Sequence, residues 1–295
     1  MAYTQLRPLG FGEILDGAFT LYRRHFVAFF LTALIPFAPV VLIYARWMGT
    51  LVEADPEMAA ENVGLAILLG IATAVAMTIV IGALTHLVAK AYAGEPVSIG
   101  DGFRNGFRRF FALIGAGIVG YVTALATIVI IAFAAALVIP IAEMAGGVVA
   151  VVVTLIIGIA ASVLMVVAMS SLFAIIPAVV VEEKGPIGAV ARSWQLARGG
   201  RMRILSVLGV TWLITMLPVF GIAFVTGFVA AFMDPESLAT ATTGELWVEN
   251  LIASISGTVT FPFWVAAMVL LYYDRRIRAE GYDLEVAVES LAEAP

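Results

Sequence analysis

The sequence predicts an all-α polytopic membrane protein, a bundle of six transmembrane helices built as three parallel repeats. Hydrophobic residues make up 62% of the chain and charged residues 13%, which leaves too few polar side chains to cover a water-exposed surface. The apolar residues gather into six runs, each long enough for a helix to cross the hydrocarbon core of a bilayer. A short segment with aromatic residues and terminal arginines precedes the first, third and fifth runs.

The predicted spans cover, in order, residues 26–48, 64–90, 111–140, 147–181, 204–233 and 250–274. Helices satisfy their own backbone hydrogen bonds, as hydrocarbon requires, and no stretch shows the alternation typical of a membrane barrel strand. The fourth run is too long for one perpendicular span and contains Pro177. We therefore expect this run either to tilt or to end near Ser170 and Ser171 and restart.

Basic residues divide the predicted connections into two sets. Of the 16 Lys and Arg residues, only Arg46, near the outer end of the first run, is counted with the first, third or fifth connection. The others lie before the first span, in the second and fourth connections, or after the last span. By the positive-inside rule, both termini and these basic connections are cytoplasmic. The opposite connections are rich in acids, which we expect to be solvated rather than to bind divalent cations: Glu53, Asp55, Glu57, Glu61, Asp234 and Glu236.

The predicted repeats divide a single membrane domain, residues 1–295, at approximately 1–94, 95–185 and 186–295. Each repeat is expected to contain a cytoplasmic interfacial amphipathic helix, an outward span, an outer connection and a returning span. The period is about 85–90 residues, which is typical of duplicated structural units. Because each repeat has two spans, all three copies face the same way and are parallel repeats.

Several stretches together resemble the membrane domain that is attached to some bacterial glycerophosphoryl diester phosphodiesterases. They are Leu6–Leu9, Glu13–Asp16, Pro177–Ile187, Arg192–Leu196 and Leu270–Leu284. The resemblance implies a six-span protein of the bacterial inner membrane. In the fused enzymes, hydrolysis belongs to a separate soluble barrel of about 250 residues. Only about twenty residues follow the last predicted span, so we expect neither that barrel nor its activity here.

The residue inventory predicts no enzyme, no metal site and no cofactor. The chain has no cysteine and only two histidines, His25 and His86, which argues against a metal site built from these ligands. No nucleophile and base can be paired, and the predicted span interiors contain no carboxylate for ion-coupled transport. The basic residues are spread over several membrane-flanking segments rather than one groove, so we expect no nucleic-acid partner.

Arginines beside the aromatic residues are the candidate contacts for lipid headgroups, since basic side chains gain about 1 kcal/mol each near anionic lipid. The candidates are Arg23, Arg24, Arg108, Arg109, Arg198, Arg201 and Arg203, together with His86 as a hydrogen-bond donor to a lipid phosphate. The alternative for the arginines is that they only orient the chain. The alternative for His86 is a bond to a neighbouring residue.

Small and hydroxyl residues recur every four residues in the second, fourth and sixth predicted spans, except that Val166 stands between Ser162 and Ser170. They are Gly70, Ala74, Thr78 and Gly82, then Thr154, Gly158, Ser162 and Ser170, then Ser254 and Thr258. This spacing places each set on one helix face, and small faces let helices approach closely in lipid. We expect these spans to meet around a central axis, either as a packing seam or, alternatively, as a polar conduit.

These patterns together favour a non-enzymatic integral membrane protein that acts as a scaffold or as a lipid- or partner-binding module. Its expected partners are anionic membrane lipids, with a protein partner at the cytoplasmic face as a further candidate. The alternative hypothesis is a permease or lipid-moving protein that uses the axis between the three repeats.

Overall fold

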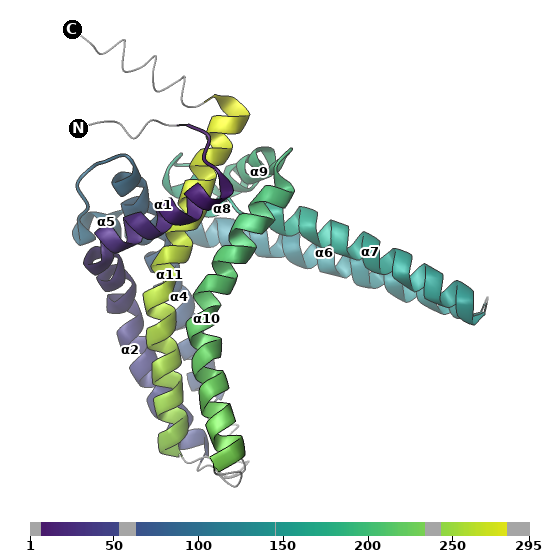
Figure 1. Cartoon of the computed structure of the whole chain (residues 1–295), viewed down its shortest axis with the longest axis horizontal. Helices are drawn as coiled ribbons and strands as arrows, with labels where there is room; N and C mark the ends of the chain where they lie inside the picture. The colour runs from purple at the N-terminus through teal and green to yellow at the C-terminus, as the bar shows by residue number, and fades with distance from the viewer. Residues whose placement is uncertain (1–6, 53–62, 145, 234–242, 282–295) are drawn as a thin grey trace. The chain divides into compact units, whose positions relative to one another are not determined.

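A computed structural model of the chain describes residues 7–52, 63–144, 146–233 and 243–281, and all regular secondary structure in these ranges is α-helical (Figure 1). The helices are α1 (Phe11–Arg24), α2 (Phe26–Val52), α4 (Val63–Tyr92), α5 (Ile99–Arg108), α6 (Phe110–Met144), α7 (Gly147–Ser171), α8 (Ile175–Val180), α9 (Pro186–Ala197), α10 (Arg201–Met233) and α11 (Thr243–Glu280). The predicted all-α class is confirmed.

Six segments of these helices are long and apolar enough to cross a membrane, which agrees with the six predicted runs and indicates a multi-pass membrane protein. They are Phe26–Tyr44, Val63–Tyr92, Phe110–Ala142, Gly147–Val180, Arg201–Pro218 and Ser254–Glu280. Each contains an apolar window of the length that a bilayer requires.

The fourth span follows the second of the two predicted alternatives, because α7 ends at Ser171 and α8 begins at Ile175. The interruption leaves the backbone N–H of Ala174 outside a regular helix. This N–H donates to the hydroxyl of Ser193 on α9, at 2.9 Å. A buried amide needs such a partner, so α9 stabilises the break in the span.

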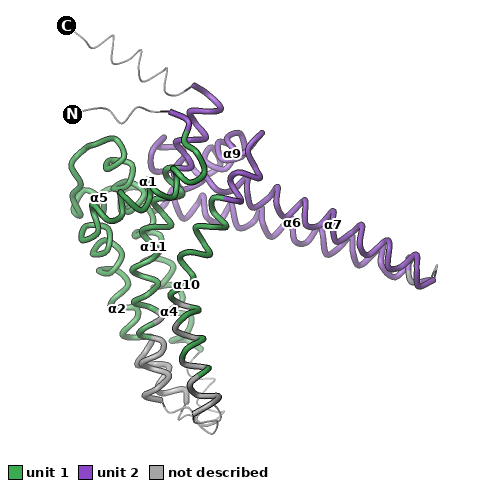
Figure 2. The backbone as a smooth tube through the Cα atoms, in the orientation of Figure 1, with its two compact units in different colours: residues 1–5, 9–110, 207–270 green, residues 6–8, 111–206, 271–295 purple. Residues whose placement is uncertain are grey.

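The chain forms two compact units, each assembled from separate stretches (Figure 2). Unit 1 comprises residues 1–5, 9–110 and 207–270, and unit 2 comprises residues 6–8, 111–206 and 271–295. Helices α10 and α11 therefore contribute to both units. The threefold internal repetition remains a prediction from the sequence.

In unit 1, α5 packs closely against α4. A Cβ atom added at Gly106 of α5 would lie 2.8 Å from the carbonyl oxygen of Ile79, so only glycine permits this approach. Helix α1 contacts α11 in the same unit. The hydroxyl of Tyr22 donates to the carbonyl of Val259 at 2.7 Å, and the Phe19 and Phe263 rings meet edge to face with centroids 6.4 Å apart.

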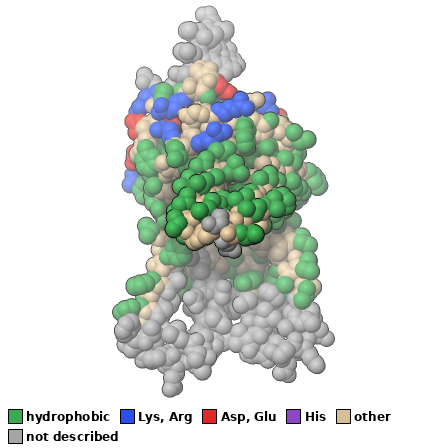
Figure 3. Space-filling view, turned by 90° about the vertical axis from the view of Figure 1, so that its right-hand side faces the viewer, with side chains coloured by type: hydrophobic (Ala, Val, Ile, Leu, Met, Phe, Trp, Pro, Cys, Tyr) green, Lys and Arg blue, Asp and Glu red, His purple; other side chains and the backbone are tan. Residues whose placement is uncertain are grey.

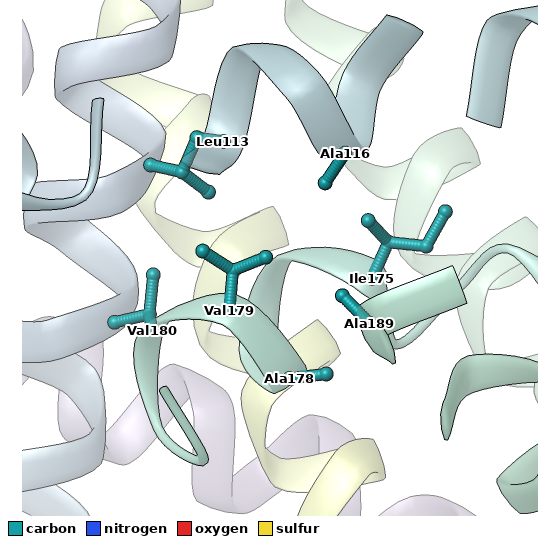
Figure 4. Packing of buried hydrophobic residues seen from close by; sticks show 7 residues of the cluster. All are labelled: Leu113, Ala116, Ile175, Ala178, Val179, Val180 and Ala189. Carbon is teal, nitrogen blue, oxygen red and sulfur yellow. The ribbon is translucent and has the colours of Figure 1, made fainter. Parts of the chain in front are cut away.

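The core of unit 2 is a cluster of apolar side chains from α6, α8 and α9, shown in Figure 4. Its members are Leu113, Ala116, Ile175, Ala178, Val179, Val180 and Ala189. Most apolar side chains along the rest of α6 and α7 are exposed, and hydrophobic side chains cover much of the surface facing the viewer in Figure 3. An apolar surface of this extent is suited to hydrocarbon rather than to water.

Candidate functional site

Arg192 of α9 joins two carboxylates in unit 2. Its Nε donates to both carboxylate oxygens of Glu182, each at 2.8 Å, and its Nη2 donates to Oε2 of Glu280 at 2.7 Å. The Arg192 Nη1 also contacts Oε1 of Glu280. The hydrogen bonds to Glu280 are the largest cause that raises the pKa of Arg192 above its ordinary value, and the bonds to Glu182 add to it. Arg192 therefore remains charged.

The C-terminal end of α11 completes this group of side chains. The hydroxyl of Tyr272 donates to Oε1 of Glu182. The Nε of Arg276 lies 3.7 Å from Glu182 and 3.6 Å from Glu280, and its guanidinium carbon is 5.9 Å from the Tyr272 ring centroid. We call Glu182, Arg192, Tyr272, Arg276 and Glu280 the carboxylate–arginine network. Its two positive and two negative side chains balance.

Glu182 is held by a tight turn after α8. The backbone N–H of Val181 donates to the carbonyl of Pro177 at 2.7 Å, and the N–H of Lys184 donates to the carbonyl of Ala178 at 3.1 Å. Between them, Glu183 has a φ of 56°, in the left-handed region that non-glycine residues seldom adopt. A residue in this region costs on the order of 1 kcal/mol, which the surrounding contacts must offset.

A second carboxylate of α11, that of Asp274, is completely buried. Its side chain is 0% exposed, and it accepts from the Nε of Arg203 at 3.0 Å and from the Nε of Arg278 at 2.9 Å. A buried charge is costly unless it is paired and hydrogen-bonded, and Asp274 meets both conditions. The pair with Arg203 ties the end of α11 to the start of α10.

Arg275 is also buried, with 6% of its surface exposed, and it bonds backbone rather than carboxylates. Its Nε donates to the carbonyl of Leu196 at 3.0 Å, and its Nη2 donates to the carbonyl of Arg198 at 2.8 Å. Carbonyls at a helix C-terminus have no partner within the helix, so Arg275 caps α9. A Cβ atom at Gly200 would overlap the Arg275 guanidinium, so any larger residue there would displace the guanidinium.

The predicted headgroup arginines differ in their surroundings. Arg23, Arg24, Arg108 and Arg198 are exposed, whereas Arg109, Arg201 and Arg203 are partly buried. Within the described residues, Arg23, Arg24, Arg198 and Arg201 have no carboxylate partner. Arg201 instead lies 5.9 Å from the Trp194 ring centroid, and Arg203 is bound to Asp274. His86, the eighth candidate, is half-buried on α4.

Large apolar side chains are exposed close in sequence to these arginines. On α1, Phe11 and Phe19 are exposed in the helix that ends with Arg23 and Arg24. In unit 2, Ile187 of α9 and Met202 of α10 are exposed on either side of the turn that carries Arg198. An apolar surface beside unpaired cations is the composition expected of a surface at the headgroup level of a bilayer.

The small-residue stripes are divided between exposed and buried positions. Gly70, Ala74, Thr154, Gly158 and Ser162 are exposed, Thr78 and Ser254 are half-buried, and Gly82, Ser170 and Thr258 are buried. The hydroxyls of Thr78, Ser162, Ser170 and Thr258 each donate to the carbonyl four residues earlier. Their protons are thus used within their own helices. The meeting of the three spans around one axis stays a prediction.

The sequence reasoning missed the buried ion pairs at the end of α11. It expected no carboxylate in the span interiors and gave no role to Asp274, the last residue of the predicted sixth span, which is buried in the apolar segment Ser254–Glu280. Spacing of four between Tyr272, Arg276 and Glu280, and between Asp274 and Arg278, is the signal that could have indicated two charged faces. The acid-rich stretches at Glu53–Glu61 and Asp234–Glu236 lie outside the described residues, and among the described residues no His, Asp and Glu cluster suited to a metal occurs.

Comparison with known proteins places most of the chain in one family. Residues 20–276 match the model of a family described as Domain of unknown function (DUF7847). No curated protein and no solved structure matches the chain. The description of the matching family names no activity, and the resemblance to a phosphodiesterase membrane domain remains a prediction.

Proposed function

We propose that the chain, which belongs to the DUF7847 family, is a non-enzymatic protein of the bacterial inner membrane that binds anionic phospholipid headgroups through exposed and partly exposed arginines. In this proposal it acts as a scaffold or lipid-binding module with both termini in the cytoplasm. The charge distribution supports this orientation, because 15 of the 16 Lys and Arg residues fall on one side of the predicted topology. The three short helices α1, α5 and α9 would then be the interfacial helices of three parallel repeats.

The observation that carries the proposal is a set of exposed or partly buried arginines that have no carboxylate partner among the described residues. They lie in or next to helices that also expose large apolar side chains. In unit 1 these are Arg23 and Arg24 at the end of α1, directly before the span that begins at Phe26. An arginine already neutralised by a carboxylate gains little from a phosphate, whereas an unpaired arginine at headgroup level gains about 1 kcal/mol. The exposed Phe19 on the same helix would enter the acyl boundary.

In unit 2 the corresponding residues are Arg198, which is exposed in the turn between α9 and α10, and Arg201, the partly buried first residue of α10. Arg203, which the sequence alone placed among the headgroup contacts, is bonded to Asp274. The proposal therefore assigns the headgroup contacts of this unit to Arg198 and Arg201. The balanced carboxylate–arginine network is assigned a structural role, holding α9 and the α8–α9 turn against the end of α11.

Native mass spectrometry of the full chain in mild detergent, titrated with phosphatidylglycerol, tests this function. Removing the two arginines of one unit should weaken binding at that unit by about 2 kcal/mol, or about 30-fold. The variants are Arg23→Gln with Arg24→Gln for unit 1 and Arg198→Gln with Arg201→Gln for unit 2. Arg→Lys at the same positions is the matched control, because lysine keeps the charge and should retain most of the binding.

Two results would contradict the proposal. One is that the folded glutamine variants bind phosphatidylglycerol as tightly as the wild-type chain. The other is that the wild-type chain binds phosphatidylcholine, which has no net charge, as tightly as phosphatidylglycerol. Circular dichroism of each variant establishes that the helices are retained.

A further inference from the structure

We infer that Arg275 is a positioning residue that holds the α9–α10 turn and thereby presents Arg198 and Arg201 to an anionic headgroup. The inference rests on the proposed function, since it concerns the same headgroup site in unit 2. It goes beyond that function by assigning the binding strength of the site to a buried arginine that itself has almost no access to lipid.

The hydrogen bonds of Arg275 fix the path of this turn. Its Nε and Nη2 donate to the carbonyls of Leu196 and Arg198 at once, so two N–H groups of the planar guanidinium bind backbone. The turn closes with two further bonds, from the N–H of Gly200 to the carbonyl of Ala197 at 3.1 Å and from the N–H of Ile204 to the carbonyl of Gly200 at 3.0 Å. The backbone that carries Arg198 is therefore held from the side of α11.

Two glycines allow the guanidinium to reach this position. Gly199 has a φ of +74°, which turns the chain sharply after Arg198. Gly200 leaves the space that the Arg275 guanidinium occupies, because a Cβ atom there would overlap it. The segment Arg198–Gly199–Gly200–Arg201 therefore packs around the Arg275 guanidinium. Its two outer arginines have no carboxylate partner in the part of the chain that the structure describes.

The arginines near this turn bind different partners and so have different roles. Asp274 pairs with Arg203 and Arg278, and Arg201 lies over the Trp194 ring. Arg275 uses backbone carbonyls, so its charge is directed to the turn rather than to the surface. Holding the backbone that carries Arg198 and Arg201 in place before binding reduces the ordering cost that a headgroup would otherwise have to offset.

Substitutions at Arg275 and Gly200 test the inference in the full chain. Arg275→Lys keeps the charge but cannot bond two carbonyls with a planar fork. Gly200→Ala displaces the guanidinium without changing any charge, so it serves as a second variant. Its matched control is Gly188→Ala on α9, where the nearest atom to an added Cβ is the Lys184 Cβ at 3.8 Å, an ordinary contact.

Both Arg275→Lys and Gly200→Ala should weaken phosphatidylglycerol binding at unit 2 by about tenfold, which corresponds to the cost of ordering the backbone of about one residue. They should also speed amide hydrogen exchange across residues 196–204, whereas Gly188→Ala should change neither quantity. In a chain that already carries Arg198→Gln and Arg201→Gln, Arg275→Lys should cause no further loss of binding. The contribution of Arg23 and Arg24 should be unaffected.

The failure of this inference is distinguishable from the failure of the proposed function. If Arg198→Gln with Arg201→Gln weakens binding while Arg275→Lys and Gly200→Ala leave it unchanged, the headgroup site stands and Arg275 does not position it. Faster exchange in the turn with unchanged binding overturns the inference in the same way. If the loss caused by Arg275→Lys persists in the chain lacking Arg198 and Arg201, the residue does not act through them.

Discussion

Replacing Asp274 should be one of the most destabilising single changes in the charged region of unit 2. Its carboxylate is 0% exposed and accepts hydrogen bonds from two arginines. Removing one member of a buried ion pair generally costs about 3–5 kcal/mol, because the remaining charge is left without compensation. The side chains of Arg203 and Arg278 are 27% and 36% exposed, so both can turn partly toward water. We therefore expect Asp274→Ala to cost about 3 kcal/mol, near the lower end of that range.

The chain provides a matched control for this prediction. Asp101 is paired with Lys90 at 3.4 Å, but its side chain is 50% exposed. Exposed pairs contribute about 0–1 kcal/mol, since water and salt screen both charges. Asp101→Ala should consequently change the free energy of unfolding by less than about 1 kcal/mol.

The assay is reversible unfolding in detergent micelles, followed by circular dichroism during titration with a denaturing detergent. The difference between the two variants should be about 2 kcal/mol or more. If both variants lose the same small amount of stability, the burial of Asp274 has no energetic consequence. The reasoning about the end of α11 would then be refuted.

Three further predictions concern the network, the helix packing and the orientation. Tyr272→Phe removes a hydroxyl that donates to the Glu182 carboxylate, and it should lower the free energy of unfolding by about 1.5–3 kcal/mol in the same assay. An effect below about 0.5 kcal/mol would contradict this hydrogen bond. Gly106→Ala brings a Cβ atom to 2.8 Å from the Ile79 carbonyl and should lower the free energy of unfolding by about 1–3 kcal/mol. Its control is Gly117→Ala, whose added Cβ atom has no neighbour within 4 Å and which should be close to neutral. The chain has no cysteine, so a single cysteine replacement reports on which side of the membrane its position lies. In intact cells a membrane-impermeant maleimide should label Met144→Cys and leave Lys184→Cys unlabelled. The reverse pattern would contradict the proposed orientation.

The break in the fourth span shows how much of the fold follows from local sequence. The run was too long for one span and contained Pro177, and the structure ends α7 at Ser171 and starts α8 at Ile175. Length, apolar composition and proline act within a few turns of one helix, so they can be evaluated without tertiary structure. The six spans were predictable for the same reason.

The pairing of Arg203 with Asp274 could not be predicted from the sequence. The two residues are 71 positions apart, and an arginine at the start of a membrane helix has the same local sequence whether it faces lipid or a buried carboxylate. Arg275, Arg276 and Arg278 were likewise interpreted only as markers of orientation. Their separate roles depend on which segments meet at the end of α11, and this is set by tertiary packing rather than by hydropathy.

The central claim is that anionic lipid is selected by the four arginines that have no carboxylate partner within the described ranges. It is tested most directly by native mass spectrometry of the full chain in an equimolar mixture of phosphatidylglycerol and phosphatidylcholine. The wild-type chain and a variant with lysine at 23, 24, 198 and 201 should retain mainly phosphatidylglycerol, and the corresponding glutamine variant should retain the two lipids equally. Equal selectivity in the folded glutamine variant and the wild-type chain would contradict the account.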